Sequence, residues 1–147
     1  MSAASNYAEA NILNYILTTN ALTSTNARPT AWYVGLFTSA TSDTVTTGGT
    51  GQGEVSTSGT GYSRQQVNFT VSTDGSGTTG GTSTATLSFP SGGAGATISW
   101  GTITHLAVFD AATGGNCLFH GAVTQSKTID AGDIFQITAG NLTVTLA

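Results

Sequence analysis

Basic residues are scarce in this sequence. Only Arg28, Arg64 and Lys127 carry positive charge among 147 residues, against seven acidic residues, which gives a net charge of −4. Proteins that bind nucleic acids draw much of their affinity from Lys and Arg contacts to phosphates, and anionic membranes attract clusters of the same residues. Three scattered cations cannot form such a patch, so we expect neither a nucleic-acid partner nor electrostatic attachment to a membrane.

Cysteine and long apolar runs are scarce as well. Cys117 is the sole cysteine, which excludes a disulfide within the chain and a cysteine-rich zinc site. We expect it to be a small buried apolar residue. No stretch approaches the roughly 18 apolar residues of a membrane-spanning helix, and the first residues lack the pattern of a secretory signal. We therefore expect folding in a cytoplasm without a targeting step, and no membrane partner.

Charged residues are few, but apolar residues are not. Charged types make up 7% of the chain and hydrophobic types 38%. Disordered chains usually combine low hydrophobicity with high net charge, so this composition predicts a folded protein whose surface is covered by Thr, Ser and Gly. The length suits one domain over residues 1–147.

The first segment has helical periodicity over residues 6–19. Asn6 can cap this helix, and Glu9 three residues later completes a capping-box pattern. The apolar residues that share one face at helical spacing are Ala8, Ile12, Leu13, Ile16 and Leu17. A helix with such a face must pack against something. We expect its own sheet, with a neighbouring subunit as the alternative.

The remainder of the chain alternates apolar and polar residues in short runs, which is typical of strands. We expect strands over residues 31–38, 67–71, 85–89, 98–100, 103–110, 117–123, 127–129, 134–137 and 142–146. Residues 39–61 and 72–82 are rich in Gly, Thr and Ser and predict long connections, and the polar residues 111–116 predict a hairpin turn. This count and spacing, without βαβ alternation, predict a mainly β fold: an antiparallel, jelly-roll-like β-sandwich with one N-terminal α-helix.

The alternation also predicts the core. We expect these residues to be largely buried: Trp32, Val34, Leu36, Val67, Phe69, Leu87, Phe89, Leu106, Val108, Phe109, Leu118, Ile134, Ile137, Val144 and Leu146. Trp100 also lies beside an apolar strand pattern. A glycan-binding sandwich would display aromatic residues on its loops, so a core position for both tryptophans disfavours that function.

Two glycine-rich segments imitate nucleotide-binding motifs. Residues 75–80 read G-x-G-x-x-G, but the following segment alternates as a strand, whereas a dinucleotide site needs a helix N-terminus there. Residues 48–53 are not followed by the Gly-Lys-Ser/Thr of a phosphate-binding loop. We interpret both segments as connections and expect no cofactor.

Candidate catalytic and metal-binding residues are equally weak. His105 shares the apolar side of its predicted strand, which favours a hydrogen-bonded core position, and His120 suits a strand end or an interface. His105, Asp110, Cys117 and His120 are types that bind zinc, but their spacing matches no metal signature. Asp130 and Asp133 flank Gly132 in a predicted turn, and Asp110 precedes another. We therefore predict no catalytic residue, no metal and no enzymatic activity.

Several segments together resemble a family of small structural proteins of tailed bacteriophages, often described as tail-fibre-like. They are AWYVGLFT at 31–38, GYSRQ at 61–65, WGTITHLAVFDAATGGNCLFHGA at 100–122, KTIDAGD at 127–133 and AGNLTVTL at 139–146. The ILNYIL run at 12–17 also fits. Cys117 replaces a larger aliphatic residue, and connections 39–60 and 72–84 are longer than we expect for this family.

The resemblance implies a virion component that is assembled in the host cytoplasm and has other virion proteins as partners. The compact chain lacks the elongated repeat or coiled coil of a fibre shaft, which favours a capsid decoration (cement) protein, a homotrimer docked on the capsid through many weak contacts. A short tail fibre or another tail component is the alternative, followed by a glycan-binding sandwich.

Overall fold

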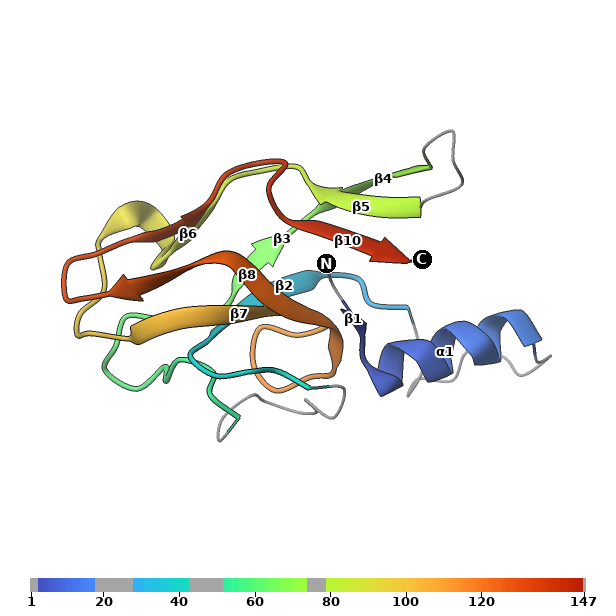
Figure 1. Cartoon of the computed structure of the whole chain (residues 1–147), viewed down its shortest axis with the longest axis horizontal. Helices are drawn as coiled ribbons and strands as arrows, with labels where there is room; N and C mark the ends of the chain where they lie inside the picture. The colour runs from blue at the N-terminus through green and yellow to red at the C-terminus, as the bar shows by residue number, and fades with distance from the viewer. Residues whose placement is uncertain (1–2, 18–27, 43–51, 74–78, 147) are drawn as a thin grey trace.

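The computed structural model describes residues 3–17, 28–42, 52–73 and 79–146. Its elements in chain order are β1 (Ala3–Ala4), α1 (Asn6–Leu17), β2 (Trp32–Phe37), β3 (Gln65–Val67), β4 (Phe69–Thr73), β5 (Thr79–Ser83), β6 (Leu87–Phe89), a 3-10 turn (Ser91–Gly93), β7 (Gly101–Phe109), β8 (Cys117–Ile129), β9 (Phe135–Ile137) and β10 (Thr143–Leu146). Within these residues the prediction of a mainly β, antiparallel fold with one N-terminal α-helix is confirmed (Figure 1).

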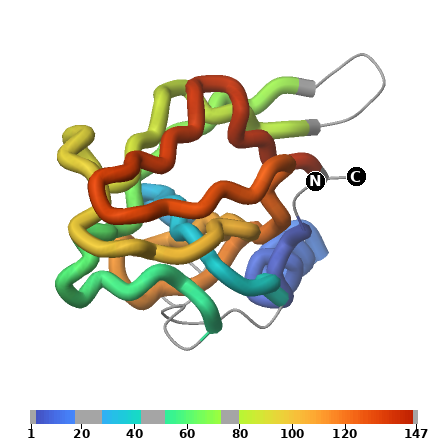
Figure 2. Tube along the Cα trace, turned by 60° about the vertical axis from the view of Figure 1, so that its left-hand side comes forward, coloured from blue at the N-terminus to red at the C-terminus, as the bar shows by residue number. Residues whose placement is uncertain are grey.

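The strands form three antiparallel sheets. A five-stranded sheet has the order β1-β8-β7-β2-β3, a three-stranded sheet the order β10-β5-β4, and a two-stranded sheet pairs β6 with β9. The two smaller sheets lie over one face of the five-stranded sheet, so that the strands make two layers (Figures 1 and 2). The helix α1 leaves the body beside β8, at the same end as the three-stranded sheet.

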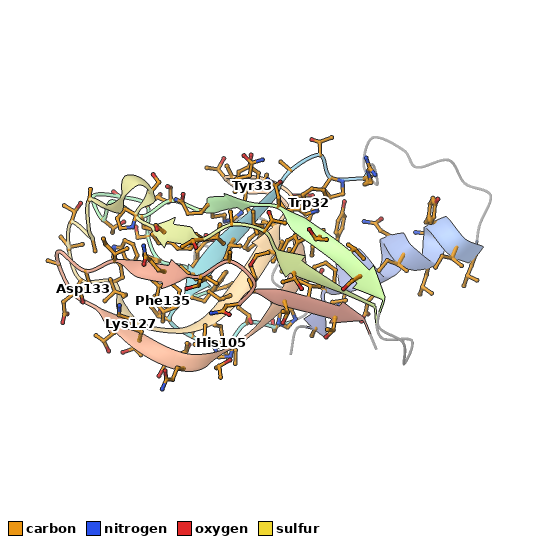
Figure 3. The ribbon with its side chains drawn as sticks, turned by 90° about the horizontal axis from the view of Figure 1, so that it is seen from above. Trp32, Tyr33, His105, Lys127, Asp133 and Phe135 are labelled. Carbon is orange, nitrogen blue, oxygen red and sulfur yellow. The ribbon has the colours of Figure 1, made fainter. Side chains whose placement is uncertain are left out.

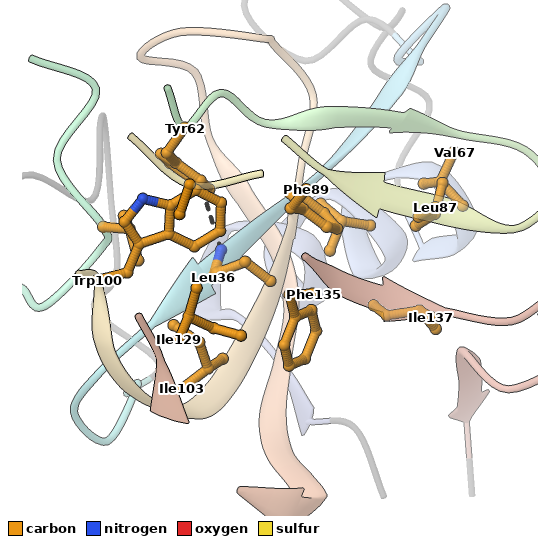
Figure 4. Packing of buried hydrophobic residues seen from close by; sticks show 13 residues of the cluster. Leu36, Tyr62, Val67, Leu87, Phe89, Trp100, Ile103, Ile129, Phe135 and Ile137 are labelled. Carbon is orange, nitrogen blue, oxygen red and sulfur yellow. Dashed lines mark hydrogen bonds between the residues drawn. The ribbon is translucent and has the colours of Figure 1, made fainter. Parts of the chain in front are cut away.

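The main hydrophobic core lies between the five-stranded and two-stranded sheets (Figure 4). Leu36 and Ile103 of the larger sheet and Phe89 of the smaller one are fully buried. Ring contacts connect Trp100, Tyr62, Phe89 and Phe135 in series, with centroid distances of 5.6 to 6.3 Å. Such contacts add to the stabilisation that the burial of apolar area provides.

The hairpin β7–β8 is the most extensive strand pairing among the described residues, and its turn is at residues 110–116. The carboxylate of Asp110 accepts hydrogen bonds from the backbone N–H of Asn116 at 2.6 Å and from its side-chain amide at 2.8 Å. Gly115 has a φ of 72°, and a side chain there would collide with Asp110. The predicted hairpin is therefore confirmed, and the turn chemistry explains its position.

The core prediction is confirmed for most of its members. The residues that are buried as expected are Val34, Leu36, Val67, Leu87, Phe89, Val108, Phe109, Leu118 and Ile137. Trp32, Phe69, Leu106, Ile134 and Val144 are only partly buried, and the side chain of Leu146 lies outside the described residues. The prediction for Ile134 was wrong because β9 begins one residue later and turns Phe135 inward instead.

Four predicted strands differ in the structure. Residues 67–71 do not form one strand: the chain passes at Asn68 from β3 in the five-stranded sheet to β4 in the three-stranded sheet, and Val71 is 69% exposed. Residues 98–100 are irregular, with Ile98 half exposed, although Trp100 N–H donates to Ile129 O at 2.9 Å beside the β7–β8 ladder. The segments 117–123 and 127–129 join in the single strand β8.

Two predicted connections contain ordered structure. Residues 79–83 form β5, which pairs with β4 on one side and β10 on the other although its sequence is TGGTS. Residues 52–61 pack beside β2: Thr38 N–H donates to Gly53 O at 2.8 Å, and Val55 N–H donates to Leu36 O at 3.0 Å. The rest of these connections, residues 43–51 and 74–78, lies outside the described residues.

The helix cap is Ser5 and not Asn6. The Ser5 hydroxyl accepts a hydrogen bond from Ala8 N–H at 3.3 Å and donates to the carbonyl of Cys117, and Ser5 O accepts from Glu9 N–H at 3.0 Å. Asn6 is the first helical residue and is exposed. The capping-box prediction was therefore shifted by one residue, because the contact of Ser5 with β8 fixes where the helix begins. Residues 18 and 19 of the predicted helix lie outside the described residues.

Candidate interaction surface

The histidines, Asp110 and Cys117 do not form one site. His120 Nδ1 lies 3.1 Å from the hydroxyl of Thr41, and His105 Nδ1 lies 2.9 Å from that of Thr104. The carboxylate of Asp110 belongs to the hairpin turn described above. Across the described residues, no group of three or more His, Cys, Asp or Glu side chains lies close enough to hold a metal ion.

His105 is partly exposed, so the prediction of a core position was wrong. Ile103 and Ala107, its neighbours on the predicted apolar side, are buried in two different clusters. The reason is a register shift in the β7–β8 ladder between Ile103 and His105, which interrupts the two-residue alternation.

Cys117 is 1% exposed, as predicted from its type, and belongs to a small cluster with Phe37, Ala107 and Phe109 on the outer face of the five-stranded sheet. Burial raises the pKa of its thiol to about 12. Since a thiolate is the reactive form of cysteine, this side chain is packed as an apolar residue and is not poised as a nucleophile.

Asp130 and Asp133 form the predicted turn. Asp133 Oδ2 accepts a hydrogen bond from Asp130 N–H at 3.1 Å, and Asp133 N–H donates to Asp130 O at 3.0 Å. Of the glycine-rich motif at 75–80, the last two residues belong to β5, which leads to another strand rather than to a helix. The other residues of that motif lie outside the described residues, as do 48–51 of the second motif.

A buried ion pair covers the outer face of the five-stranded sheet. Arg64 Nε and Nη2 donate to the two carboxylate oxygens of Glu54 at 2.7 and 2.8 Å, and the guanidinium lies 3.4 Å above the ring of Phe109. Arg64 Nη1 also donates to the carbonyls of Ala111 at 3.1 Å and Gly114 at 2.7 Å. Arg64 thus ties segment 52–64 to the β7–β8 turn.

Tyr62 completes this arrangement. Its hydroxyl donates to Glu54 Oε1 at 2.9 Å and accepts from Leu36 N–H at 3.0 Å (Figure 4). Burial, and secondly the negative charge of Glu54, raise the pKa of Tyr62 well above its ordinary value. Sequence reasoning missed this network; the signal was one Glu and one Arg within an otherwise uncharged, Gly-rich tract. All its polar groups are satisfied internally, so it is structural.

The second half of α1 stands out from the body with its apolar face uncovered. Ala8 is buried against β8, but Leu13, Tyr15, Ile16 and Leu17 are 55 to 72% exposed. Of the seven large hydrophobic residues that are exposed in the described parts of the chain, five lie in this helix. The expectation that α1 packs on its own sheet therefore holds only for its first turns.

An apolar surface continues from α1 onto the open end of the sandwich. A groove of about 650 Å³ runs between the helix and the five-stranded sheet, lined by Tyr7, Ala8, Asn11, Ile12, Tyr15, Arg28, Pro29, Trp32, Leu118 and Phe119. A hollow of about 260 Å³ adjoins it between the two layers, lined by Trp32, Phe69, Val71, Gly80, Gly81, Val108, Phe119 and Val144. Trp32 and Phe119 belong to both. Figure 3 shows Trp32 on the side of α1 and Asp133 at the opposite end.

This groove and hollow, together with α1, are what we call the open end. Apart from Arg28 and Glu9, the described residues of the open end are uncharged. Its chemistry suits the docking of another apolar surface and supplies no acid, base or nucleophile. No helix within the described residues is long and apolar enough to cross a membrane.

The sequence matches a known protein family. A family model described as "Podophage GP4 fiber I protein gp80" matches residues 3–145, nearly the whole chain. No curated protein matches the sequence. The matched range includes α1, both layers of the sandwich and the open end.

Proposed function

This chain belongs to the podophage GP4 fiber I protein gp80 family, a family of structural proteins of tailed-phage virions, and we propose that it acts without catalysis as a homo-oligomeric part of a tail fibre. The family match over residues 3–145 carries the proposal. The resemblance seen in the sequence, to small virion proteins of tailed phages, is confirmed by this match.

The placement of the polar residues supports a structural role. The two histidines, Cys117 and Asp110 each contact different neighbours, and Asp130 and Asp133 contact each other within one turn. The large uncovered surface is apolar. Other virion proteins and further copies of the chain are therefore the partners that we propose, with a homotrimer as the assembly.

Capsid decoration is the second candidate, because one observation favours it. The described residues form a compact sandwich with a single helix of about three turns, and neither a coiled coil nor a repeated element extends from it. A decoration protein needs a compact module of this kind, which binds a symmetric lattice in many copies. The family description favours the fibre.

The experiment that separates the two locations uses purified heads and purified tails that lack this protein. Each is incubated with the purified chain, pelleted and assayed for the chain, in low and in high salt. We expect stoichiometric binding to tails in both salts, since exposed ion pairs contribute little to an apolar contact. Binding to heads alone would support decoration, and binding to neither would overturn the virion assignment.

A further inference from the structure

We propose that the open end is the surface through which copies of this chain associate: the outer face of α1 of one copy docks into the groove and hollow of the next. The inference rests on the proposed structural role in a virion and names the surface that such a role would use. Three observations on the open end support it.

The first observation is that the open end carries both a protruding apolar helix, α1, and an apolar recess, by which we mean the groove and the hollow together. Leu13, Ile16 and Leu17 lie in the second half of α1, beyond its buried residue Ala8, and they are 55, 67 and 72% exposed. The recess beside them is floored by Trp32 and Phe119. Apolar patches of this size on soluble proteins usually mark an interaction site.

The second observation is the amount of surface. From the exposed fractions and the sizes of the side chains, α1 offers roughly 500 Å² of apolar area, which is less than the about 800 Å² that each partner buries in a standard interface. A partner that covered only the helix would leave the recess open. When each copy inserts its helix into one neighbour and receives a helix from another, its two contacts together cover both the helix and the recess.

The third observation is charge. Glu9 is the only charged residue of α1, and among the described residues Arg28 is the only charged one that lines the groove. Both are exposed. A copy of this chain therefore brings a negative charge on its helix to a groove with a positive charge. Of the other described acidic residues, Glu54 is paired with Arg64, and Asp133 lies at the opposite end, so the net charge of −4 opposes the contact only weakly.

The same geometry permits closure. A helix that docks into the recess of the next copy is a head-to-tail contact, and repetition of such a contact gives a ring when the rotation closes. Three copies in a ring would bury every α1 and every recess, which agrees with the homotrimer proposed above.

The test is the mass of the full chain in solution, measured by light scattering after size-exclusion chromatography. We expect an oligomer for the natural sequence and a single chain for Ile16→Gln. Ile98→Gln is the matched control, because Ile98 is the one exposed large hydrophobic residue of the described chain outside the open end, and it should leave the oligomer intact. A monomer for the natural sequence, or an oligomer that survives Ile16→Gln, would overturn the proposal.

A cross-link then locates the contact. A chain with Ile16→Cys is mixed with a chain with Val71→Cys and oxidised; Cys117 does not compete because it is 1% exposed. We expect a disulfide between the two different variants. Disulfides only between two Ile16→Cys chains would show that helix meets helix, and either that result or the absence of any disulfide would overturn docking in the hollow. Neither result depends on heads or tails, so this proposal and the virion assignment fail separately.

Discussion

Each end of the sandwich has a tryptophan beside the core, and the two tryptophans differ in how far they are buried. Trp100 is 6% exposed, its indole N–H donates to Thr60 O at 3.0 Å, and its ring contacts that of Tyr62. Trp32 is only partly buried and floors the groove and the hollow of the open end. One end completes its core from its own loops, and the other leaves apolar surface that no described residue of the chain covers.

The largest expected effect is the difference in stability loss between alanine substitutions at the two tryptophans. Trp100→Ala should lower the free energy of unfolding by about 3–5 kcal/mol, because it removes a buried ring and leaves a cavity. Trp32→Ala should cost about 1–2 kcal/mol, since part of that ring already contacts water. Urea unfolding measures both, in an Ile16→Gln background so that self-association does not contribute. Equal losses would show that the two ends are packed alike.

Substitution of Arg64 tests whether the buried ion pair on the outer face of the five-stranded sheet is shielded from water as well as the Trp100 end is. Arg64→Met should cost about 3 kcal/mol, because Glu54 keeps its bond from Tyr62 but loses its charged partner in a buried site. Arg28→Met, at an exposed position, should stay within about 0.5 kcal/mol of the natural protein. A loss below about 1 kcal/mol for Arg64→Met in urea unfolding would mean that the pair is solvated.

The N-terminus of α1 is bound to β8 through the hydrogen bonds of Ser5. Ser5→Ala should cost about 1–2 kcal/mol, since it removes the cap of the helix and the donor to the Cys117 carbonyl. Asn6→Ala, which removes the residue that the sequence pattern favours as the cap, should change stability by less than about 0.5 kcal/mol. Unfolding in urea and amide exchange of α1 measure both effects. The reverse order of the two losses would restore the sequence-based cap.

The last expected effect needs no substitution and appears at alkaline pH. The pKa values of Cys117 and Tyr62 are raised in the folded protein, so the unfolded chain loses these protons at a lower pH, near the ordinary values of about 8.5 and 10. Stability is therefore complete below about pH 8 and falls as pH rises through these values. The melting temperature should drop between pH 9 and 11, and less so in Cys117→Ala. A flat profile in the natural protein would contradict the burial of both groups.

Local patterns were enough to predict the parts of the fold in which sequence and tertiary contacts agree. The β7–β8 hairpin has alternating residues and a turn whose Asp110 and Gly115 enforce its geometry. By contrast, β5 has the sequence TGGTS, and nothing in its own residues predicts a strand. It is one because its backbone is paired on both sides, by β4 and β10, and partners so distant in sequence leave no local signal.

The open end was only half predictable for a related reason. The apolar stripe of α1 correctly predicted a helix. Periodicity does not say whether the apolar face of that helix packs against the same chain or against another molecule. The answer depends on where the helix leaves the body, and this is decided by the contacts of Ser5 with β8. The Arg64–Glu54 pair escaped prediction because two isolated charges ten residues apart have no periodic pattern.

The positions of the three basic residues have a consequence for proteolysis. Trypsin cleaves after Lys and Arg, but Arg28 is followed by Pro29, whose nitrogen carries no hydrogen and whose bond resists this enzyme. Arg64 is buried in its ion pair, and Lys127 lies within β8 and donates to Ile134 O at 3.1 Å. Cleavage after either residue requires its part of the sandwich to open first. The rate of tryptic digestion should therefore report how often the sandwich opens rather than how mobile its surface is.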